Sequence, residues 1–87
     1  MDLRQAQYVI AVVDHGSFTA AAASIPVTQP ALSQSISTLE RDLGAPLFHR
    51  LGRSVRLTPA GEAFVAPARQ MLRDAEVARS AVTAVAG

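Results

Sequence analysis

The stretch VTQPALSQSISTLERDLG, Val27 to Gly44, decides how the rest of the chain is interpreted. Its apolar residues recur at i, i+4, i+7 and i+11, which predicts a helix with one buried stripe. The opposite face of a solvated helix is usually rich in Glu and Lys, but here it is small and mostly neutral, and Ser and Thr are mediocre helix formers. This polar face is therefore the first candidate for a functional surface. The stripe is Leu32, Ile36, Leu39 and Leu43, and the polar face is Pro30, Ser33, Gln34, Ser37 and Thr38.

Two more helices are predicted before this stretch. The first covers residues from about 3 to 14 and ends at Gly16, because glycine suits a left-handed C-terminal cap. Ser17 is a good N-cap for the second helix, FTAAAASI, and Pro26 stops it. Thr28 then caps the third helix after a very short turn, which predicts a helix-turn-helix. The apolar stripe of the first helix is Leu3, Ala6, Ile10 and Val13, widened by Tyr8, Val9 and Val12, and the buried face of the second is Phe18, Ala21, Ala22 and Ile25.

The segment after Gly44 predicts a small hairpin of about 48–51 and 55–58, with its turn at Arg53. Thr58 then caps a last helix of about 59 to 85, which has proline at its first position. This helix carries a sustained 3.5-residue apolar repeat. The repeat could cover the core of the domain itself, but it is long for so small a bundle, so a dimer seam is favoured. The seam residues are Phe64, Ala68, Met71, Ala75, Ala78, Val82 and Val85.

Composition excludes several classes of function. A chain of 87 residues without Cys predicts one domain with no disulfide and no thiolate metal site. His15 and His49 are the only histidines and lack helix-spaced ligand partners, and no phosphate loop or nucleophile motif is present. We therefore expect neither an enzyme nor a bound cofactor or metal. No apolar run approaches the 18 residues of a membrane span, so we expect no membrane association.

The charge is nearly balanced, with 8 arginines, no lysine, 7 acidic residues and a net charge of +1. Between Leu43 and Gly61 there is no acidic residue, whereas three arginines fall there: Arg50, Arg53 and Arg56. A local basic patch of this kind indicates phosphate contact, although a solvated loop has the same composition.

Several motifs in order resemble the N-terminal DNA-binding domain of LysR-type transcriptional regulators. They are GSFT at 16–19, TQPALS at 28–33, LE at 39–40, LG at 43–44, PLF at 46–48, Arg50, GR at 52–53 and LTPAG at 57–61. The resemblance covers essentially the whole chain. It implies a mostly α fold, with a winged helix-turn-helix in 1–58 and a linker and dimerisation helix in 59–87.

The resemblance also implies a function. Members of this family bind double-stranded DNA sequence-specifically, as homodimers on inverted-repeat operators, in the bacterial cytoplasm at the nucleoid. They are usually about three times longer than this chain, with a C-terminal domain that binds a small-molecule effector. We therefore expect the effector to act only through a domain that these 87 residues lack. A helical protein-interaction module that dimerises through the last helix is the alternative, but it leaves the arginines and the polar face unexplained.

The same resemblance suggests roles for individual residues. A helix in the major groove needs small residues close to the bases and amides or hydroxyls that pair with base edges. An arginine at the wing tip suits a narrow minor groove. Hydroxyls at helix N-termini suit phosphates, although capping alone would also explain them. The expected base contacts are Gln29, Pro30, Ser33, Gln34, Ser37 and Arg53, and the expected phosphate contacts are Arg4, Ser17, Thr19, Thr28, Arg50 and Arg56.

The chain departs from the family pattern at two positions. Gln34 stands where the family often has Arg, which removes one contact to guanine or phosphate and shifts the expected preference toward adenine. Pro26 is unusual in the turn, where it should stiffen the backbone.

Overall fold

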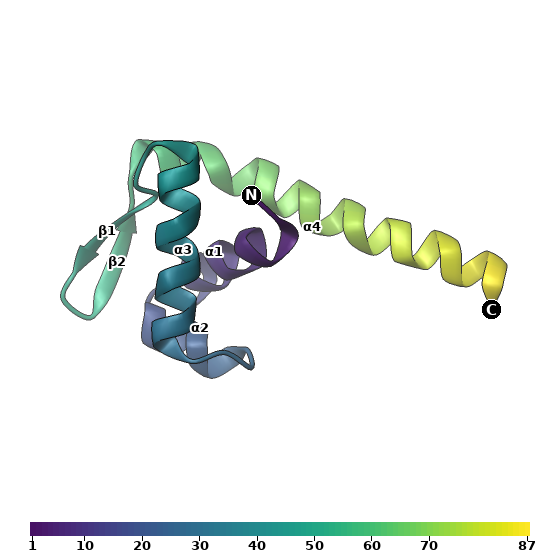
Figure 1. Cartoon of the computed structure of the whole chain (residues 1–87), viewed down its shortest axis with the longest axis horizontal. Helices are drawn as coiled ribbons and strands as arrows, with labels where there is room; N and C mark the ends of the chain where they lie inside the picture. The colour runs from purple at the N-terminus through teal and green to yellow at the C-terminus, as the bar shows by residue number, and fades with distance from the viewer.

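The computed structural model describes all 87 residues as four helices and one two-stranded sheet (Figure 1). It confirms the predicted fold, a helix-turn-helix bundle with a hairpin wing and a long last helix. The elements are α1 (Leu3–His15), α2 (Phe18–Ser24), α3 (Gln29–Leu43), β1 (Phe48–Leu51), β2 (Ser54–Leu57) and α4 (Pro59–Ala86).

Side-chain caps set where the helices begin. The hydroxyls of Ser17, Thr28 and Thr58 each accept a hydrogen bond from the backbone N–H three residues on, which confirms all three predicted N-caps. At the start of α1, Asp2 and Gln5 form a reciprocal capping box that the sequence analysis did not anticipate. The caps therefore hold α2 and α3 in separate positions on either side of a short turn.

Helix ends follow equally local rules. Gly16 and Gly44 adopt left-handed backbone angles, with φ of 78° and 79°, and end α1 and α3 as expected. Helix α2 stops at Ser24, one residue earlier than predicted, because Ile25 precedes a proline and is extended.

The core lies where α1, α2 and α3 meet the start of the wing. The prediction that Leu3 and Leu43 are buried is wrong, because Leu3 is 44% exposed and Leu43 is 41% exposed. Both lie in a terminal turn, Leu3 at the start of α1 and Leu43 at the end of α3, where the helix has no further turn to cover them. Val13, Ala22 and Ile25 are only partly buried and pack at the edge of the core. The buried cluster is Val9, Val12, Phe18, Ala21, Leu32, Ile36, Leu39, Leu47 and Phe48.

The wing is a hairpin with Phe48 opposite Leu57 and Leu51 opposite Ser54. Its second strand begins and ends one residue earlier than predicted, because Thr58 leaves the strand to cap α4. Phe48 is buried and meets the ring of Phe18 edge to face, with 5.7 Å between ring centroids. This contact anchors the base of the wing against the start of α2.

A buried polar junction joins the wing to α4. The hydroxyl of Thr58 donates to the carbonyl oxygen of Pro46 at 2.7 Å and accepts from the N–H of Gly61 at 2.9 Å. The backbone N–H of Thr58 donates to the carbonyl oxygen of Leu47 at 3.0 Å. Gly61 is buried directly against that same carbonyl, where a Cβ atom has no room.

The first half of α4 packs against α1, and the second half extends away from the bundle (Figure 1). Ala68 is fully buried with Ala6 and Ile10, while Phe64 and Met71 pack beside them. The seam prediction is therefore wrong for Ala68, because a side chain already buried within one chain cannot contact a partner. The division of the chain into a winged helix-turn-helix (1–58) and a linker helix (59–87) stays a prediction. The buried core extends beyond residue 58 into α4.

One ion pair also joins α4 to α1. The guanidinium of Arg69 donates to both carboxylate oxygens of Asp14, at 2.6 and 3.3 Å. This hydrogen bond, aided by the positive charge, lowers the pKa of Asp14 below its usual value and raises the pKa of Arg69. The pair adds a surface contact between α4 and the C-terminal end of α1.

Gly61→Ala is expected to destabilise the chain by about 1–3 kcal/mol, because the added methyl group meets the Leu47 carbonyl. Helix propensity alone predicts the opposite sign, a gain of about 1 kcal/mol. Chemical denaturation followed by circular dichroism measures the difference. Ala63→Gly, at an exposed position of the same helix, is the matched control and should lose about 1 kcal/mol. A Gly61→Ala variant more stable than the parent would refute the packing argument.

Asp14→Asn is expected to lower the melting temperature slightly at neutral pH, because it weakens the contact with Arg69. A carboxyl with a lowered folded-state pKa stabilises the fold above its unfolded pKa of about 4, and this contribution is lost as the pH falls through the folded value. The effect should be small because both side chains reach solvent. Thermal unfolding between pH 7 and pH 2 should show the two proteins converging at acid pH. Asp74→Asn, which removes the same charge outside any ion pair, should show no comparable convergence.

Candidate nucleic-acid interface

Helix α3 presents the predicted polar face outward. Gln29, Pro30 and Gln34 are exposed, and Ser33 and Ser37 are half-buried. Their spacing of one, three, one and three residues keeps all five side chains on one side of the helix. The structure therefore brings together the five residues of α3 that the sequence analysis selected for base contact.

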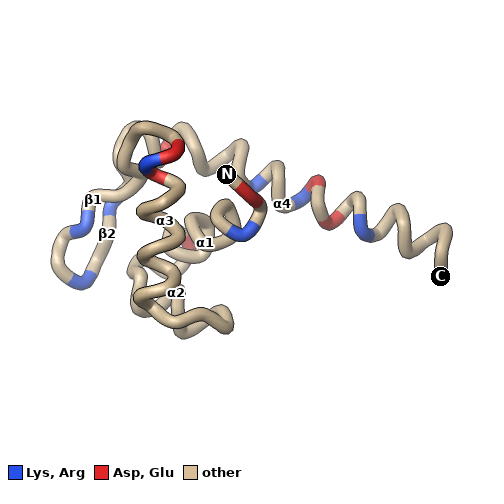
Figure 2. Tube along the Cα trace, in the orientation of Figure 1, with Lys and Arg blue, Asp and Glu red and all other residues tan.

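This face is free of charge along most of its length. Figure 2 shows α3 uncoloured from its N-terminus to its last turns, where Glu40, Arg41 and Asp42 follow one another. The wing beside it carries only positive charge (Figure 2). A neutral row of amides and hydroxyls thus lies next to a basic hairpin.

The N-terminus of α3 offers fewer backbone donors than an ordinary helix. Pro30 has no N–H, and the N–H of Ala31 is occupied by the Thr28 hydroxyl at 3.2 Å. The N–H of Gln29 is therefore the free donor nearest the exposed end of the helix. Thr28 is exposed, and its O–H remains able to donate, so capping and phosphate contact are compatible at this residue.

The start of α2 shows a similar arrangement. The Ser17 hydroxyl accepts from the N–H of Ala20 at 3.0 Å and is half-buried, whereas Thr19 is exposed. Arg4 is exposed on α1 and lies beside the helix-turn-helix turn, across a surface pocket that Pro26 also lines. Phosphate contact stays a prediction for Arg4, Ser17 and Thr19.

The three arginines of the wing occupy different positions. Arg53 lies in the two-residue turn with Gly52, at the tip of the hairpin, and Arg56 lies opposite His49. All three are exposed, and none forms an ion pair with a carboxylate. Their charges therefore remain available to an external anion.

Arg50 makes internal contacts that the sequence analysis missed. Its Nη1 donates to the Oγ of Ser33 at 2.8 Å, and its guanidinium carbon lies 4.2 Å from the centre of the Phe18 ring. A residue predicted to touch phosphate and a residue predicted to touch a base are thus bonded to each other. Nothing in the spacing of residues 33 and 50 signals this contact.

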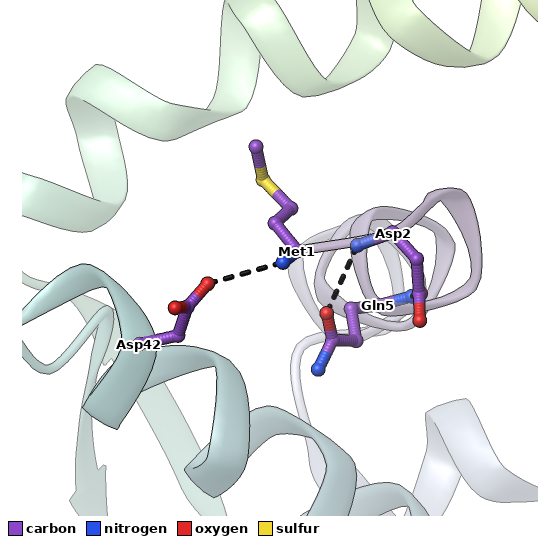
Figure 3. Close-up of polar contacts among 4 residues, drawn as sticks. All are labelled: Met1, Asp2, Gln5 and Asp42. Atoms are coloured by element: carbon purple, nitrogen blue, oxygen red, sulfur yellow. Dashed lines mark hydrogen bonds and ion pairs between the residues drawn. The ribbon is translucent and has the colours of Figure 1, made fainter.

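The far end of α3 is held by two further polar contacts. The carboxylate of Glu40 accepts from the N–H of Leu47 at 2.6 Å, and Asp42 accepts from the amino group of Met1 at 3.0 Å (Figure 3). The first connects α3 to the segment before the wing, and the second connects it to α1. Both fix the C-terminal end of α3, whereas on the polar face of its N-terminal half the hydrogen bond from Arg50 to Ser33 is the only side-chain hydrogen bond from another element.

No group of three or more His, Asp or Glu side chains is arranged to hold a metal ion. None of the helices is both long enough and apolar enough to cross a bilayer.

The family model described as bacterial regulatory helix-turn-helix protein, LysR family, matches residues 3–62. The chain belongs to the LysR family. It is 47% identical over 72 residues to the HTH-type transcriptional regulator TfdT of Cupriavidus pinatubonensis, and this match covers 83% of the chain. The same match covers 32% of TfdT, so the chain spans about a third of that regulator's length.

Two solved structures are similar to this LysR-family chain over its whole length. The crystal structure of the CbnR DNA-binding domain with DNA has a TM-score of 0.92 and 39% identity, and the match covers all of both chains. The complex of the BenM DNA-binding domain with catB site 1 DNA has a TM-score of 0.94 and 38% identity, covering 100% of this chain and 97% of that one. The wing and the long α4 are therefore shared features of these domains.

Proposed function

We propose that this LysR-family domain binds double-stranded DNA sequence-specifically, as the DNA-binding domain of a bacterial transcriptional regulator. The observation that carries the proposal is the side-by-side placement of an uncharged polar helix face and a wing of arginines without acidic partners. The two similar DNA-binding domains solved with DNA support the same function. Its setting is the bacterial cytoplasm, with the nucleoid as the target.

Helix α3 enters the major groove, which admits an α-helix and displays a distinct donor and acceptor pattern for each base pair. Gln29 lies at the exposed N-terminal end, where a recognition helix meets the bases first. Its amide can pair bidentately with adenine, and so can that of Gln34. The ring of Pro30 offers apolar contact to a thymine methyl group. Ser33 and Ser37 supply hydroxyls farther along the same face.

The wing supplies the second set of contacts. Arg53, at the tip of the hairpin, reaches the minor groove, whose negative potential is enhanced where the groove is narrow. Arg56 contacts phosphate, as do the hydroxyl of Thr28 and the free N–H of Gln29 at the positive end of α3. Arg4, Ser17 and Thr19 complete the proposed phosphate contacts from α1 and α2. Arg50 adds a positive charge close to both elements.

Helix α4 joins two copies of the chain. Every residue beyond Ala75 is exposed, and Val82 and Val85 are 67% and 90% exposed. Ala75, Ala78, Val82 and Val85 follow one face of the helix at alternating spacings of three and four residues. Phe64 and Met71, which are partly exposed, extend that face toward the bundle. A symmetric pair of such helices places two α3 helices on an inverted repeat.

Selection from randomised duplex DNA with the 87-residue chain tests the function. Enrichment of an inverted repeat is the expected result. Retention without sequence enrichment would contradict specific recognition. No retention even at low salt would contradict DNA binding, and would favour a protein-interaction module that pairs through α4.

The same selection, repeated with a variant of α4, tests the proposed dimer. Val82→Glu places a charge in the proposed seam and should leave enrichment of a single half-site with weaker retention. Ser80→Glu, which adds the same charge on another side of α4, should retain the inverted repeat. If both variants keep the full repeat with equal affinity, the proposed seam is wrong.

Gln29→Ala is expected to relax specificity at one base pair of the selected site, at a cost of about 1–3 kcal/mol in binding free energy. The amide loses its base partner, while the fold is untouched because the side chain is exposed. Fluorescence anisotropy with every single-base variant of the site provides the measurement. Gln7→Ala, an exposed glutamine on α1, is the control and should bind as the parent does. Unchanged binding by Gln29→Ala would contradict the assignment of α3 as the recognition helix.

A further inference from the structure

The contact between Arg50 and Ser33 limits what Ser33 can recognise. A guanidinium carries only hydrogen-bond donors, so Ser33 must accept in this contact, whose length is 2.8 Å. No backbone carbonyl takes the Ser33 hydroxyl proton, whereas the Ser24 hydroxyl does donate to the carbonyl of Ala21. The O–H of Ser33 is therefore left free on the exposed side of α3.

Arg50 is held in this position by more than one contact. Its guanidinium stacks on the ring of Phe18, 4.2 Å from the ring centre, and that ring is itself fixed edge to face against Phe48. Phe18 and Phe48 are both buried, so the stacking surface belongs to the core of the domain. No carboxylate of the chain pairs with Arg50, so no acidic side chain competes with Ser33 for its donor.

We propose that Arg50 is a positioning residue that fixes the Ser33 hydroxyl as a hydrogen-bond donor, so that α3 rejects cytosine at the base facing Ser33. The inference rests on the proposed function and adds that Ser33 acts as the hydrogen-bond donor toward the base. A free hydroxyl donates or accepts and tolerates any base. With a charged donor on its oxygen, the hydroxyl becomes a stronger donor and a weaker acceptor.

The chemistry of the major groove then decides which bases fit. Guanine offers N7 and O6, adenine offers N7 and thymine offers O4, and all of these accept a hydrogen bond. Cytosine offers only its amino group, which donates. The nearby positive charge of Arg50 adds the same preference, because it attracts acceptor edges and repels the amino group. Arg50, a residue of the wing, thus affects which base α3 prefers without itself contacting a base.

The test compares Arg50→Met with Arg56→Met, two variants that each remove one positive charge from the wing. Methionine keeps an unbranched side chain over Phe18 but cannot donate to Ser33. We expect the parent chain to disfavour cytosine at one position of its selected site by about tenfold, which is near the upper end of the range for one hydrogen bond between uncharged groups. Arg50→Met should abolish most of that discrimination. Arg56→Met should weaken binding to every sequence alike and keep the discrimination.

Ser33→Ala and the double variant Ser33→Ala/Arg50→Met complete the measurement. Ser33→Ala should lose the same discrimination, and the double variant should lose no more than either single change. If Arg50→Met lowers all affinities by one factor and keeps the base profile of the parent, Arg50 only contacts phosphate and the inference is overturned. If the parent selects no site at all, the proposed function itself has failed. Thermal unfolding of each variant shows whether the fold is retained.

Discussion

Burial of one face of α3 is the constraint on which the other features depend. Leu32, Ile36 and Leu39 are completely buried against α1 and α2. Each such side chain contributes about 1.5–3 kcal/mol, so turning the helix about its axis would cost several kcal/mol. Since side chains on a helix keep fixed angular positions, this burial also determines that Gln29 and Gln34 face outward. The recognition surface is thus a consequence of the core.

The wing depends on a second, polar constraint at the other end of α3. Glu40 receives the N–H of Leu47, and Thr58 bridges Pro46 and Gly61. No buried side-chain polar atom is left without a partner, so this junction avoids the cost of an unpaired buried polar group. Because it sets the direction in which the hairpin leaves the bundle, it places the wing arginines on the same side as the polar face of α3.

Helix α4 follows one continuous apolar repeat, but the two halves of the repeat have different surroundings. Its first half buries Ala68 against α1, and the ion pair between Asp14 and Arg69 adds a surface contact beside it. Its second half extends into solvent with apolar side chains exposed, and exposed apolar surface of this kind is typical of a contact with another chain. The two halves belong to one continuous helix, which matters for the proposed dimer. If the C-terminal halves of two α4 helices pair, the distance between the two α3 helices of the dimer is fixed as well.

Local sequence alone determined the helices, their caps, the short turn, the hairpin and the outward face of α3, because each depends on periodicity or on residues three or four positions apart. The base-contact and phosphate-contact roles remain predictions. Tertiary structure decided the exposure of Leu3 and Leu43, the burial of Ala68, and the bond between Arg50 and Ser33. Each of these depends on how closely segments distant in the sequence approach one another. Such distances are set by the packing of whole elements, and no spacing within one element encodes them.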